Sequence, residues 1–291
     1  MITCHSEYGR ITSILLKEAD KAFESQEKAD SEWRELNYLE KVDFAVALNE
    51  YQVFRNLLVE DGATPLFLPK ADTTIDSIYC RDASIATDQG MIFCRMGKGA
   101  RMNEPTAQQA FCKANDIPIL GMIQAPGTLE GGDMCWLDQQ TLCVGHTYRS
   151  NLEGIRQLKA LVAPLGVDVL VVDLPHYKGE SDVFHLMSIL SPIDKDLAVV
   201  YSPLMPIGFR NELIERGFSL VECPEDEFES MGSNVLALAP RKVLMVSGNP
   251  KTASLLQAKG CEVLIYDGEE ISQKGCGGPT CLTRPINREI D

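Results

Sequence analysis

Two patterns of apolar residues alternate along the chain. Stretches with apolar residues at three- and four-residue steps, as in Ile155, Leu158 and Leu161–Val162, predict amphipathic helices. Each stretch is followed by a glycine or a short break and then by a β-branched run bounded by Gly or Pro, which is typical of a strand. The third copy reads NLEGIRQLKALVAPLG and then VDVLVVDLP. This helix–strand unit recurs five times.

The five strands that follow these helices begin at nearly even intervals. A period of about 50 residues is typical of a supersecondary repeat, and the predicted first residues are Thr64, Ile117, Val167, Phe218 and Cys261. After each strand, a polar segment leads into an apolar hairpin. The last copy, CGGPTCLTRPI, lacks its return strand, which the N-terminal segment GRITSILLK can supply.

Five ββαβ-like units closed into a ring predict an α/β fold, a five-bladed pseudo-symmetric propeller that comprises residues 1–291 as a single domain. The alternative is a doubly wound α/β sheet, which also alternates strands and helices. Two observations favour the propeller, because no GxGxxG follows the first strand and each unit carries an extra hairpin.

The polar segments before the hairpins place one candidate residue in each unit. In chain order these residues are Asp82, Glu130, His185, Asn234 and Cys281. If the units are related by rotation, all five point toward one central axis. The repeat therefore predicts a Cys–His–carboxylate site built from residues that are distant in sequence.

These residue types suit hydrolysis through a covalent intermediate. Cys281 is a nucleophile as its thiolate, and His185 can donate a proton to a leaving amine and then accept one from water. Glu130 can orient His185, as the third member of a catalytic triad does. Asp82 can accept hydrogen bonds from a planar cation.

Each of these residues also has a simpler interpretation. Cys281 can be an ordinary thiol and His185 a core histidine. Glu130 and Asp133 in LEGGD can be loop residues, and Asp82 can cap the end of a strand. Asn234 is grouped with the substrate-contacting positions, although a structural role is the simpler expectation for it. The rival nucleophile is Cys276, and the rival bases are His146 and His176; they are disfavoured because they do not occupy matched places in the repeat.

Composition narrows the class of protein. The net charge of −15 disfavours nucleic acid as a partner, because phosphate binding needs a basic surface. There is no apolar run long enough to span a membrane, and the first residues do not resemble a signal peptide. The ten scattered cysteines predict reduced thiols in the cytoplasm. No metal or cofactor is expected, because Cys and His do not cluster at ligand spacing; a homodimer is possible on general grounds.

The motifs LEGGD, HLMS and GGPTCLT, in this order, resemble the guanidino-group-modifying superfamily, and the resemblance covers nearly the whole chain. It is strongest to the dimethylarginine dimethylaminohydrolase branch, through DSIYCRD with Asp76 and Asp82, through Arg101, and through TYRSN with Arg149. The resemblance implies a five-bladed propeller. It also implies Cys281 as nucleophile and two other catalytic residues, His185 and Glu130.

The same resemblance implies how the substrate is held. Asp82 would bind the guanidinium and Asp76 the α-amino group, while Arg101 and Arg149 would meet the α-carboxylate or shape the pocket. The alternative for the two arginines is an ordinary surface charge.

Two positions depart from the related patterns. Met187 stands where similar arginine deiminases have an acidic residue, which favours a methylated nitrogen over plain arginine. Arg81 stands where dimethylarginine hydrolases often have an acid. It is expected to point away from Asp82; if it points inward, it would favour a neutral ureido group such as that of citrulline.

The leading hypothesis is hydrolysis of Nω-methylated arginine to citrulline and a methylamine. Citrulline ureidase and arginine deiminase or dihydrolase are the alternatives, and an amidinotransferase or a non-catalytic propeller that binds a partner is less favoured. The charged segment 17–43 is expected to form a solvated helix between Ala19 and Leu39, with a lid over the pocket as the alternative.

Overall fold

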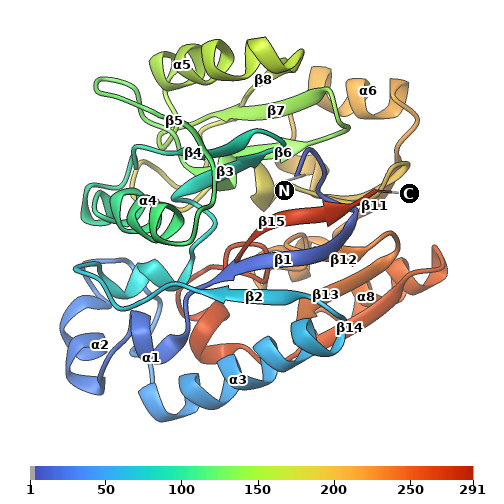
Figure 1. Cartoon of the computed structure of the whole chain (residues 1–291). Coiled ribbons are helices and arrows are strands. Elements are labelled where there is room, and N and C mark those ends of the chain that lie inside the picture. The colour runs from blue at the N-terminus through green and yellow to red at the C-terminus, as the bar shows by residue number, and fades with distance from the viewer. Residues whose placement is uncertain (1–3, 291) are drawn as a thin grey trace.

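The computed structural model describes residues 4–290, and its strands form five separate three-stranded sheets. The sheets surround a common centre, and the longer helices lie on the outside of the ring (Figure 1). Four sheets repeat one order of elements: two antiparallel strands, an outer helix, and a third strand parallel to the second. The fold is the predicted five-bladed α/β-propeller.

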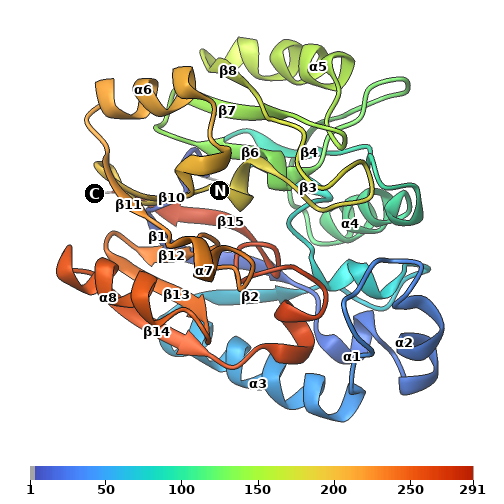
Figure 2. The same cartoon turned by 180° about the vertical axis from the view of Figure 1, so that it is seen from behind.

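The four continuous blades follow one another along the chain. Their elements are β3 (Ser84–Thr87), β4 (Gly90–Phe93), α4 (Glu104–Ala114) and β5 (Ile119–Met122); β6 (Met134–Trp136), β7 (Thr141–His146), α5 (Leu152–Val162) and β8 (Asp168–Asp173); β9 (Leu190–Asp194), β10 (Leu197–Val200), α6 (Ile207–Glu215) and β11 (Ser219–Glu222); β12 (Leu236–Ala239), β13 (Lys242–Val246), α8 (Pro250–Ala258) and β14 (Glu262–Tyr266). Figure 2 shows the last two of these blades from behind, with the short helix α7 (Glu225–Phe228) between them.

The fifth blade joins the two ends of the chain. Its strands are β15 (Thr283–Glu289), β1 (Arg10–Leu16) and β2 (Thr64–Phe67). β1 pairs antiparallel with β15, with Ile14 opposite Pro285, and parallel with β2, with Leu15 opposite Leu66. The N-terminal strand therefore completes the last repeat and closes the ring, as predicted.

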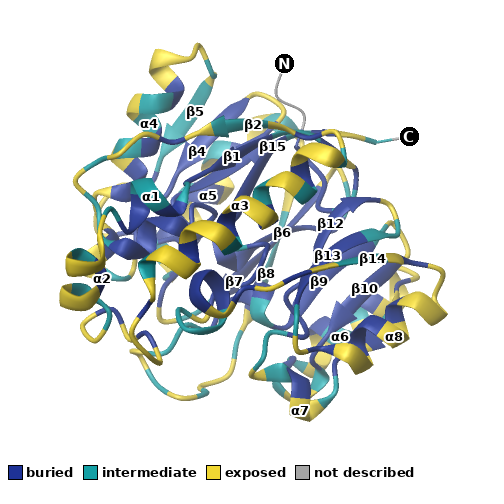
Figure 3. Cartoon of the chain, turned by 90° about the horizontal axis from the view of Figure 1, so that it is seen from below, coloured by how far each residue is buried: buried dark blue, intermediate teal, exposed yellow. Residues whose placement is uncertain are grey.

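The strand pattern explains the layers of the fold. The strands nearest the centre, such as β3 and β4, are buried along their whole length, whereas outer strands such as β5 are half-buried beneath their helices (Figure 3). The third strands of the four continuous blades and β2 start within two residues of the predicted positions. Helix α5 buries Ile155, Leu158 and Val162, as its spacing predicts, and its N-cap Asn151 accepts a hydrogen bond from Gly154 N at 2.8 Å. No helix in residues 4–290 combines the length and apolar character needed to cross a bilayer.

The segment before the long helix α3 (Phe44–Glu60) differs from the prediction. Instead of one solvated helix, it forms α1 (Ala19–Ala22) and α2 (Gln26–Glu32), separated by Glu24 with a φ of 63°. Phe23 and Ala29 are fully buried. The chain then runs irregularly through residues 33–40, which we call the cap segment. Burial of one face, with a cap at Ser25 that accepts from Lys28 N, outweighs the helix propensity of the whole stretch.

Candidate active site

All five matched polar residues lie around one cavity of about 330 Å³. Each precedes the first strand of a blade, and together they come from all five blades; the residues are Asp82, Glu130, His185, Asn234 and Cys281. The loops before the inner strands meet at one end of the propeller axis, so the pseudo-symmetry brings them together. A cavity of this size suits a ligand of amino-acid dimensions.

Glu130 and His185 form the central contact of the site. Nε2 of His185 lies 2.8 Å from Oε2 of Glu130, and Glu130 is fully buried. The other carboxylate oxygen accepts a hydrogen bond from Lys98 N at 2.9 Å. Gly132 lies directly against the imidazole, and a side chain there would collide with His185 Nδ1. The second glycine of LEGGD is therefore needed to seat the imidazole, whereas the first, Gly131, lies against the backbone oxygens of Arg81 and Ser84.

Asp133 holds the segments that carry this contact. Its Oδ1 accepts from Leu186 N at 3.0 Å, and its Oδ2 accepts from Ser150 Oγ at 2.6 Å and Thr147 Oγ1 at 2.8 Å. Complete burial raises the pKa of Asp133 to about 6, against the charge of His185 and these hydrogen bonds. Sequence reasoning treated Asp133 as a loop residue; its place after the GG pair is the only signal for this role.

The charges in the site favour an ion pair between Glu130 and His185. Burial works to lower the pKa of His185, but the charges of Asp133 and Asp82 and the contact with Glu130 outweigh it and raise that pKa. Burial works to raise the pKa of Glu130, and the hydrogen bond and charge of His185 hold it below its usual value. At neutral pH the imidazole therefore carries a proton that it can donate.

Cys281 is half-buried and is held by two neighbours. The side-chain amide of Asn234 donates to its sulfur at 3.4 Å, and the Asn234 carbonyl oxygen accepts from Thr280 N and Thr280 Oγ1 at 3.1 and 2.9 Å. Burial, followed by the charge of Asp82, raises the pKa of the Cys281 thiol, while the contacts with Thr280 and Asn234 oppose the rise. Asn234 thus contacts the candidate nucleophile, and this geometry fits a residue that positions Cys281.

The rival residues lie in different surroundings. Cys276 is exposed and contributes to the cavity wall. His146 pairs with Asp173 at 2.8 Å, and His176 bonds to the Tyr148 hydroxyl at 2.8 Å, in a separate surface depression. The two rival histidines therefore have no contact with the cavity.

Arg101 is buried and faces the carboxylates of the site. Its Nη1 lies 2.6 Å from Asp82 Oδ2, and its Nε and Nη2 each donate to the Glu104 carboxylate at 2.8 Å. Nη2 also donates to Tyr79 O at 2.9 Å. Because only 5% of its surface is exposed, Arg101 is not the surface charge that was the alternative. Its guanidinium is occupied by protein acceptors, so its place fits the shaping of the pocket.

One carboxylate oxygen of Asp82 can accept a hydrogen bond from a ligand. Its Oδ1 is buried, has no hydrogen-bond partner within residues 4–290, and lies 4.0 Å from His185 Nδ1. A buried carboxylate oxygen without a donor is costly unless a ligand or water supplies one. The site thus offers an acceptor beside the imidazole.

Two further predicted residues lie on the cavity wall. Asp76 is buried, and its Oδ2 pairs with Lys98 Nζ at 2.6 Å. Arg149 is also buried, and its guanidinium lies 3.7 Å from Glu130 and donates to Asp182 O at 3.3 Å. Burial again excludes the surface-charge alternative. Sequence reasoning missed Lys98, which lies in GKG three residues before Arg101.

Arg81 and Met187, the two residues that depart from the related sequence patterns, lie in different surroundings. Arg81 is fully buried, and its guanidinium pairs with Glu7 at 2.8 Å. Arg81 also lines the cavity, but this carboxylate offsets its charge, which weakens the argument for a neutral ureido group such as that of citrulline. Met187 lines the cavity, as do other apolar side chains, namely Val183, Phe184, Phe228 and Met231.

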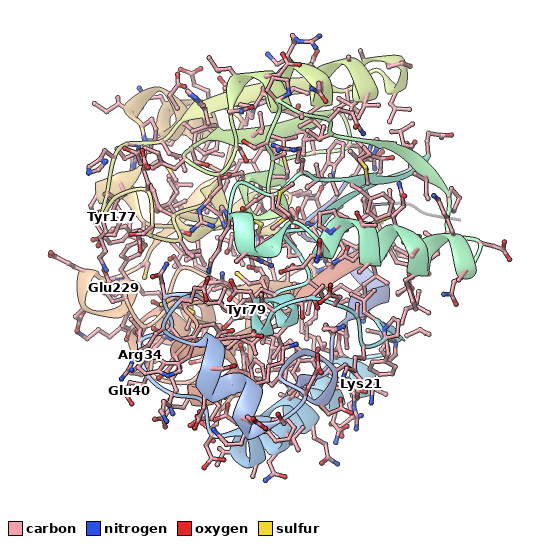
Figure 4. The ribbon with its side chains drawn as sticks, turned by 90° about the vertical axis from the view of Figure 1, so that its left-hand side faces the viewer. Lys21, Arg34, Glu40, Tyr79, Tyr177 and Glu229 are labelled. Carbon is pink, nitrogen blue, oxygen red and sulfur yellow. The ribbon has the colours of Figure 1, made fainter. Side chains whose placement is uncertain are left out.

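The cap segment covers part of the cavity. Leu36, Asn37 and Leu39 line it, and Asn37 Nδ2 donates to Ser181 O on the opposite wall at 3.3 Å. In Figure 4 the cap residues Arg34 and Glu40 lie on the same side of the molecule as Tyr177 and Glu229, two residues that line the cavity. The position of the cap agrees with the lid that was the alternative to a solvated helix.

Three side chains are close enough together to hold a metal ion. Ligand atoms of Asp82, Glu130 and His185 lie within 4.8 Å of one another. Glu130 and His185 already bond to each other, and the second Asp82 oxygen pairs with Arg101. A cation would have to displace the imidazolium proton from this network, so the donor set fits acid–base chemistry better than metal binding.

The fold and site define a cysteine-containing propeller of the guanidino-group-modifying superfamily. The structure of a dimethylarginine dimethylaminohydrolase from Pseudomonas aeruginosa, a Cys→Ser variant in complex with citrulline, superposes with a TM-score of 0.76. It is 22% identical, and the match covers 96% of this chain and 100% of that chain. An amidinotransferase from Microseira wollei has a TM-score of 0.79 at 13% identity, over 100% of this chain and 98% of that chain. These likenesses establish the fold.

Sequence comparison places the chain within one branch of the superfamily. The family model described as N,N dimethylarginine dimethylhydrolase, eukaryotic, matches residues 19–288. The N(G),N(G)-dimethylarginine dimethylaminohydrolase of Streptomyces coelicolor is 31% identical over 253 residues, which are 87% of this chain and 90% of the relative. The chain belongs to the N,N-dimethylarginine dimethylhydrolase family.

Proposed function

We propose that the protein hydrolyses the guanidino group of an Nω-methylated arginine to citrulline and a methylamine through a covalent adduct on Cys281. The observation that carries the proposal is the convergence of a thiol, a protonated imidazole and two carboxylates from separate blades around one cavity. The family of the chain and the names of its relatives support the same reaction class.

The first half of the reaction forms the adduct. Asp82 Oδ1 accepts a hydrogen bond from the substrate guanidinium, whose positive charge beside Cys281 favours the thiolate over the thiol, and the thiol releases its proton to solvent. The thiolate attacks the central guanidino carbon, and His185 transfers its proton to the substituted nitrogen as the C–N bond breaks. The products of this step are a neutral methylamine and a thiouronium adduct, with His185 left neutral beside Glu130.

The second half resolves the adduct with water. Neutral His185 accepts a proton from a water molecule as the oxygen bonds to the thiouronium carbon. The C–S bond then breaks and the electron pair returns to the sulfur. The proton that remains on the new oxygen passes to the sulfur, which restores the thiol and leaves the carbonyl of citrulline. Glu130 stabilises the imidazolium that forms again, as the orienting acid of a triad does.

The apolar wall favours a methylated leaving group. Met187 cannot pair with a second guanidinium nitrogen, whereas Met187 and Phe184 can contact N-methyl groups. An unpaired polar N–H in such a wall costs about 1–3 kcal/mol, which disfavours unsubstituted arginine. Arginine deiminase or dihydrolase activity is the alternative, and it requires arginine to tolerate this wall.

A substrate panel read by mass spectrometry tests the proposal. Methylated arginines, arginine and citrulline are each incubated with the protein, and citrulline, methylamines, ammonia and ornithine are measured. We expect methylarginine to give citrulline and a methylamine, with a Cys281 adduct after acid quench. Cys281→Ser should abolish turnover and leave the fold intact, whereas Cys276→Ser should remain active. Full activity in Cys281→Ser would rule out this nucleophile.

A further inference from the structure

We propose that Lys98 is a specificity-determining residue that binds the α-carboxylate of the substrate. The proposal rests on the proposed function and assigns the amino-acid end of the same cavity. In this arrangement the ammonium of Lys98 binds the α-carboxylate of the substrate, while the carboxylate of Asp76 binds its α-ammonium. Lys98 and Asp76 thus form one receptor for a zwitterion.

The ion pair of Lys98 and Asp76 has the geometry that such a receptor needs. Nζ of Lys98 lies 2.6 Å from Oδ2 of Asp76, and their side chains are only 12% and 5% exposed. Both residues line the cavity. A buried ion pair gives little net stability, because desolvation offsets the attraction. Such a pair is nevertheless complementary to an amino acid, because its ammonium can bind the α-carboxylate while its carboxylate binds the α-ammonium.

Lys98 also has one hydrogen-bond donor left for a ligand. An ammonium has three donors, and Lys98 uses two of them, on Asp76 Oδ2 and on Leu36 O at 2.8 Å. Arg101 has five donors, but four are satisfied by Asp82, the two oxygens of Glu104 and Tyr79 O. Arg101 therefore has little capacity left for a carboxylate.

Arg149 faces a different part of the cavity wall from Lys98. Its guanidinium lies near Glu130 at 3.7 Å and donates to Asp182 O at 3.3 Å, which directs it toward the wall opposite the cap. Lys98 is the cation that contacts the cap directly, through Leu36 O. A carboxylate bound to Lys98 would thus lie beneath the cap, at the end of the cavity that also holds Asp76. The reacting carbon would lie near His185 and Cys281.

The experiment compares two substrates that differ only at this end. The kcat/KM of an Nω-methylated arginine is divided by that of its α-carboxamide, which keeps the guanidinium and the α-ammonium but carries no carboxylate charge. For the unaltered protein we expect this ratio to be roughly 30 or more, the value of a charge-assisted hydrogen bond. In Lys98→Met the ratio should approach 1, mainly through a higher KM for the acid.

Two variants separate binding from structure. Lys98→Arg keeps the charge and should retain most of the ratio. Lys21→Met removes a lysine whose pair with Asp20 has the same 2.6 Å separation, but on the surface with both side chains more than 40% exposed, and it should not change the ratio. If Lys98 only braces the cap, Lys98→Met would slow both substrates equally and keep the ratio, which would overturn the proposal.

The outcome also distinguishes this proposal from the proposed function. If the unaltered protein cleaves neither the acid nor the carboxamide, the assigned reaction is wrong and this inference falls with it. If it cleaves both and Lys98→Met keeps the full preference for the acid, only the assignment of Lys98 is wrong. Thermal unfolding of each variant confirms that the comparison is made on folded protein.

Discussion

The side-chain amide of Asn234 donates to the sulfur of Cys281 at 3.4 Å, while its carbonyl oxygen holds the backbone and hydroxyl of Thr280. One amide thus fixes the residue before the candidate nucleophile and contacts the nucleophile itself. A hydrogen bond donated to sulfur is stronger when the sulfur is charged, so it favours the thiolate. This contact works against burial, which raises the pKa of Cys281.

Replacing Asn234 should therefore affect chemistry more than binding. In Asn234→Ala we expect kcat to fall by roughly 10- to 100-fold, the cost of about 1.5–3 kcal/mol for a lost hydrogen bond to a charged group, with KM nearly unchanged. The pKa of Cys281, measured by its rate of alkylation against pH, should rise further. The control is Asn249→Ala, which removes another buried Asn that bonds to Ser230 O and Val246 O outside the cavity. An unchanged pKa in Asn234→Ala would contradict the proposed contact.

The reactivity of Cys281 in the free protein should have a distinctive pH dependence. Because burial and the charge of Asp82 raise the pKa of Cys281, the thiol form persists to higher pH than in an ordinary cysteine, whose pKa is about 8.5. Alkylation by iodoacetamide should thus rise with pH to a midpoint above that value. A substrate-like guanidinium should lower the midpoint. A midpoint near neutrality in the free protein would contradict this account.

Asp82→Asn should change binding and reactivity in opposite directions. Loss of the charge should weaken binding of a cationic substrate by about 2–3 kcal/mol, or roughly 30- to 150-fold in KM. The same change removes a negative charge that raises the pKa of Cys281, so alkylation at neutral pH should become faster. The control Asp173→Asn removes a surface carboxylate that pairs with His146, and both readouts should stay the same. An unchanged KM in Asp82→Asn would exclude the guanidinium role.

The repeated parts of this protein are visible in the sequence, and the parts that occur once are not. The sequence predicts the first residue of the strand after each helix to within two residues of its observed position, because β-branched runs between glycines carry a local signal in every blade. The same repeat placed Cys281, His185 and Glu130 around one axis. The segment 19–40 occurs once, and burial of Phe23, Ala29 and Leu36 against the rest of the fold overrides the helix propensity of residues 19–39.

Pairings between distant side chains leave no mark on the sequence. Lys98 was not singled out, because a lysine between two glycines resembles a surface turn until the fold brings it to Asp76. Arg81 was recognised as unusual, but its partner Glu7 is 74 residues away and belongs to the N-terminal segment. Such contacts are fixed by the closure of the ring, which only the three-dimensional arrangement shows.

The pair of Arg81 and Glu7 leads to a prediction about stability. Arg81 is fully buried, and Glu7 is 7% exposed and lies 2.8 Å from its guanidinium. Glu7→Gln would leave a buried charge without its counter-ion, which costs about 3–5 kcal/mol. We expect the free energy of unfolding in urea to fall by that amount, with little change in the slope against urea concentration.

A surface pair provides the matched control for Glu7→Gln. Glu153→Gln removes the same charge from a pair with Arg156 at 2.8 Å, where the arginine side chain is 68% exposed, and it should leave the free energy of unfolding essentially unchanged. The double variant Glu7→Gln with Arg81→Met should recover part of the loss, because it removes the unpaired charge as well. Equal effects of the two glutamate substitutions would contradict a buried ion pair, since solvent screens the surface pair and cannot reach the other.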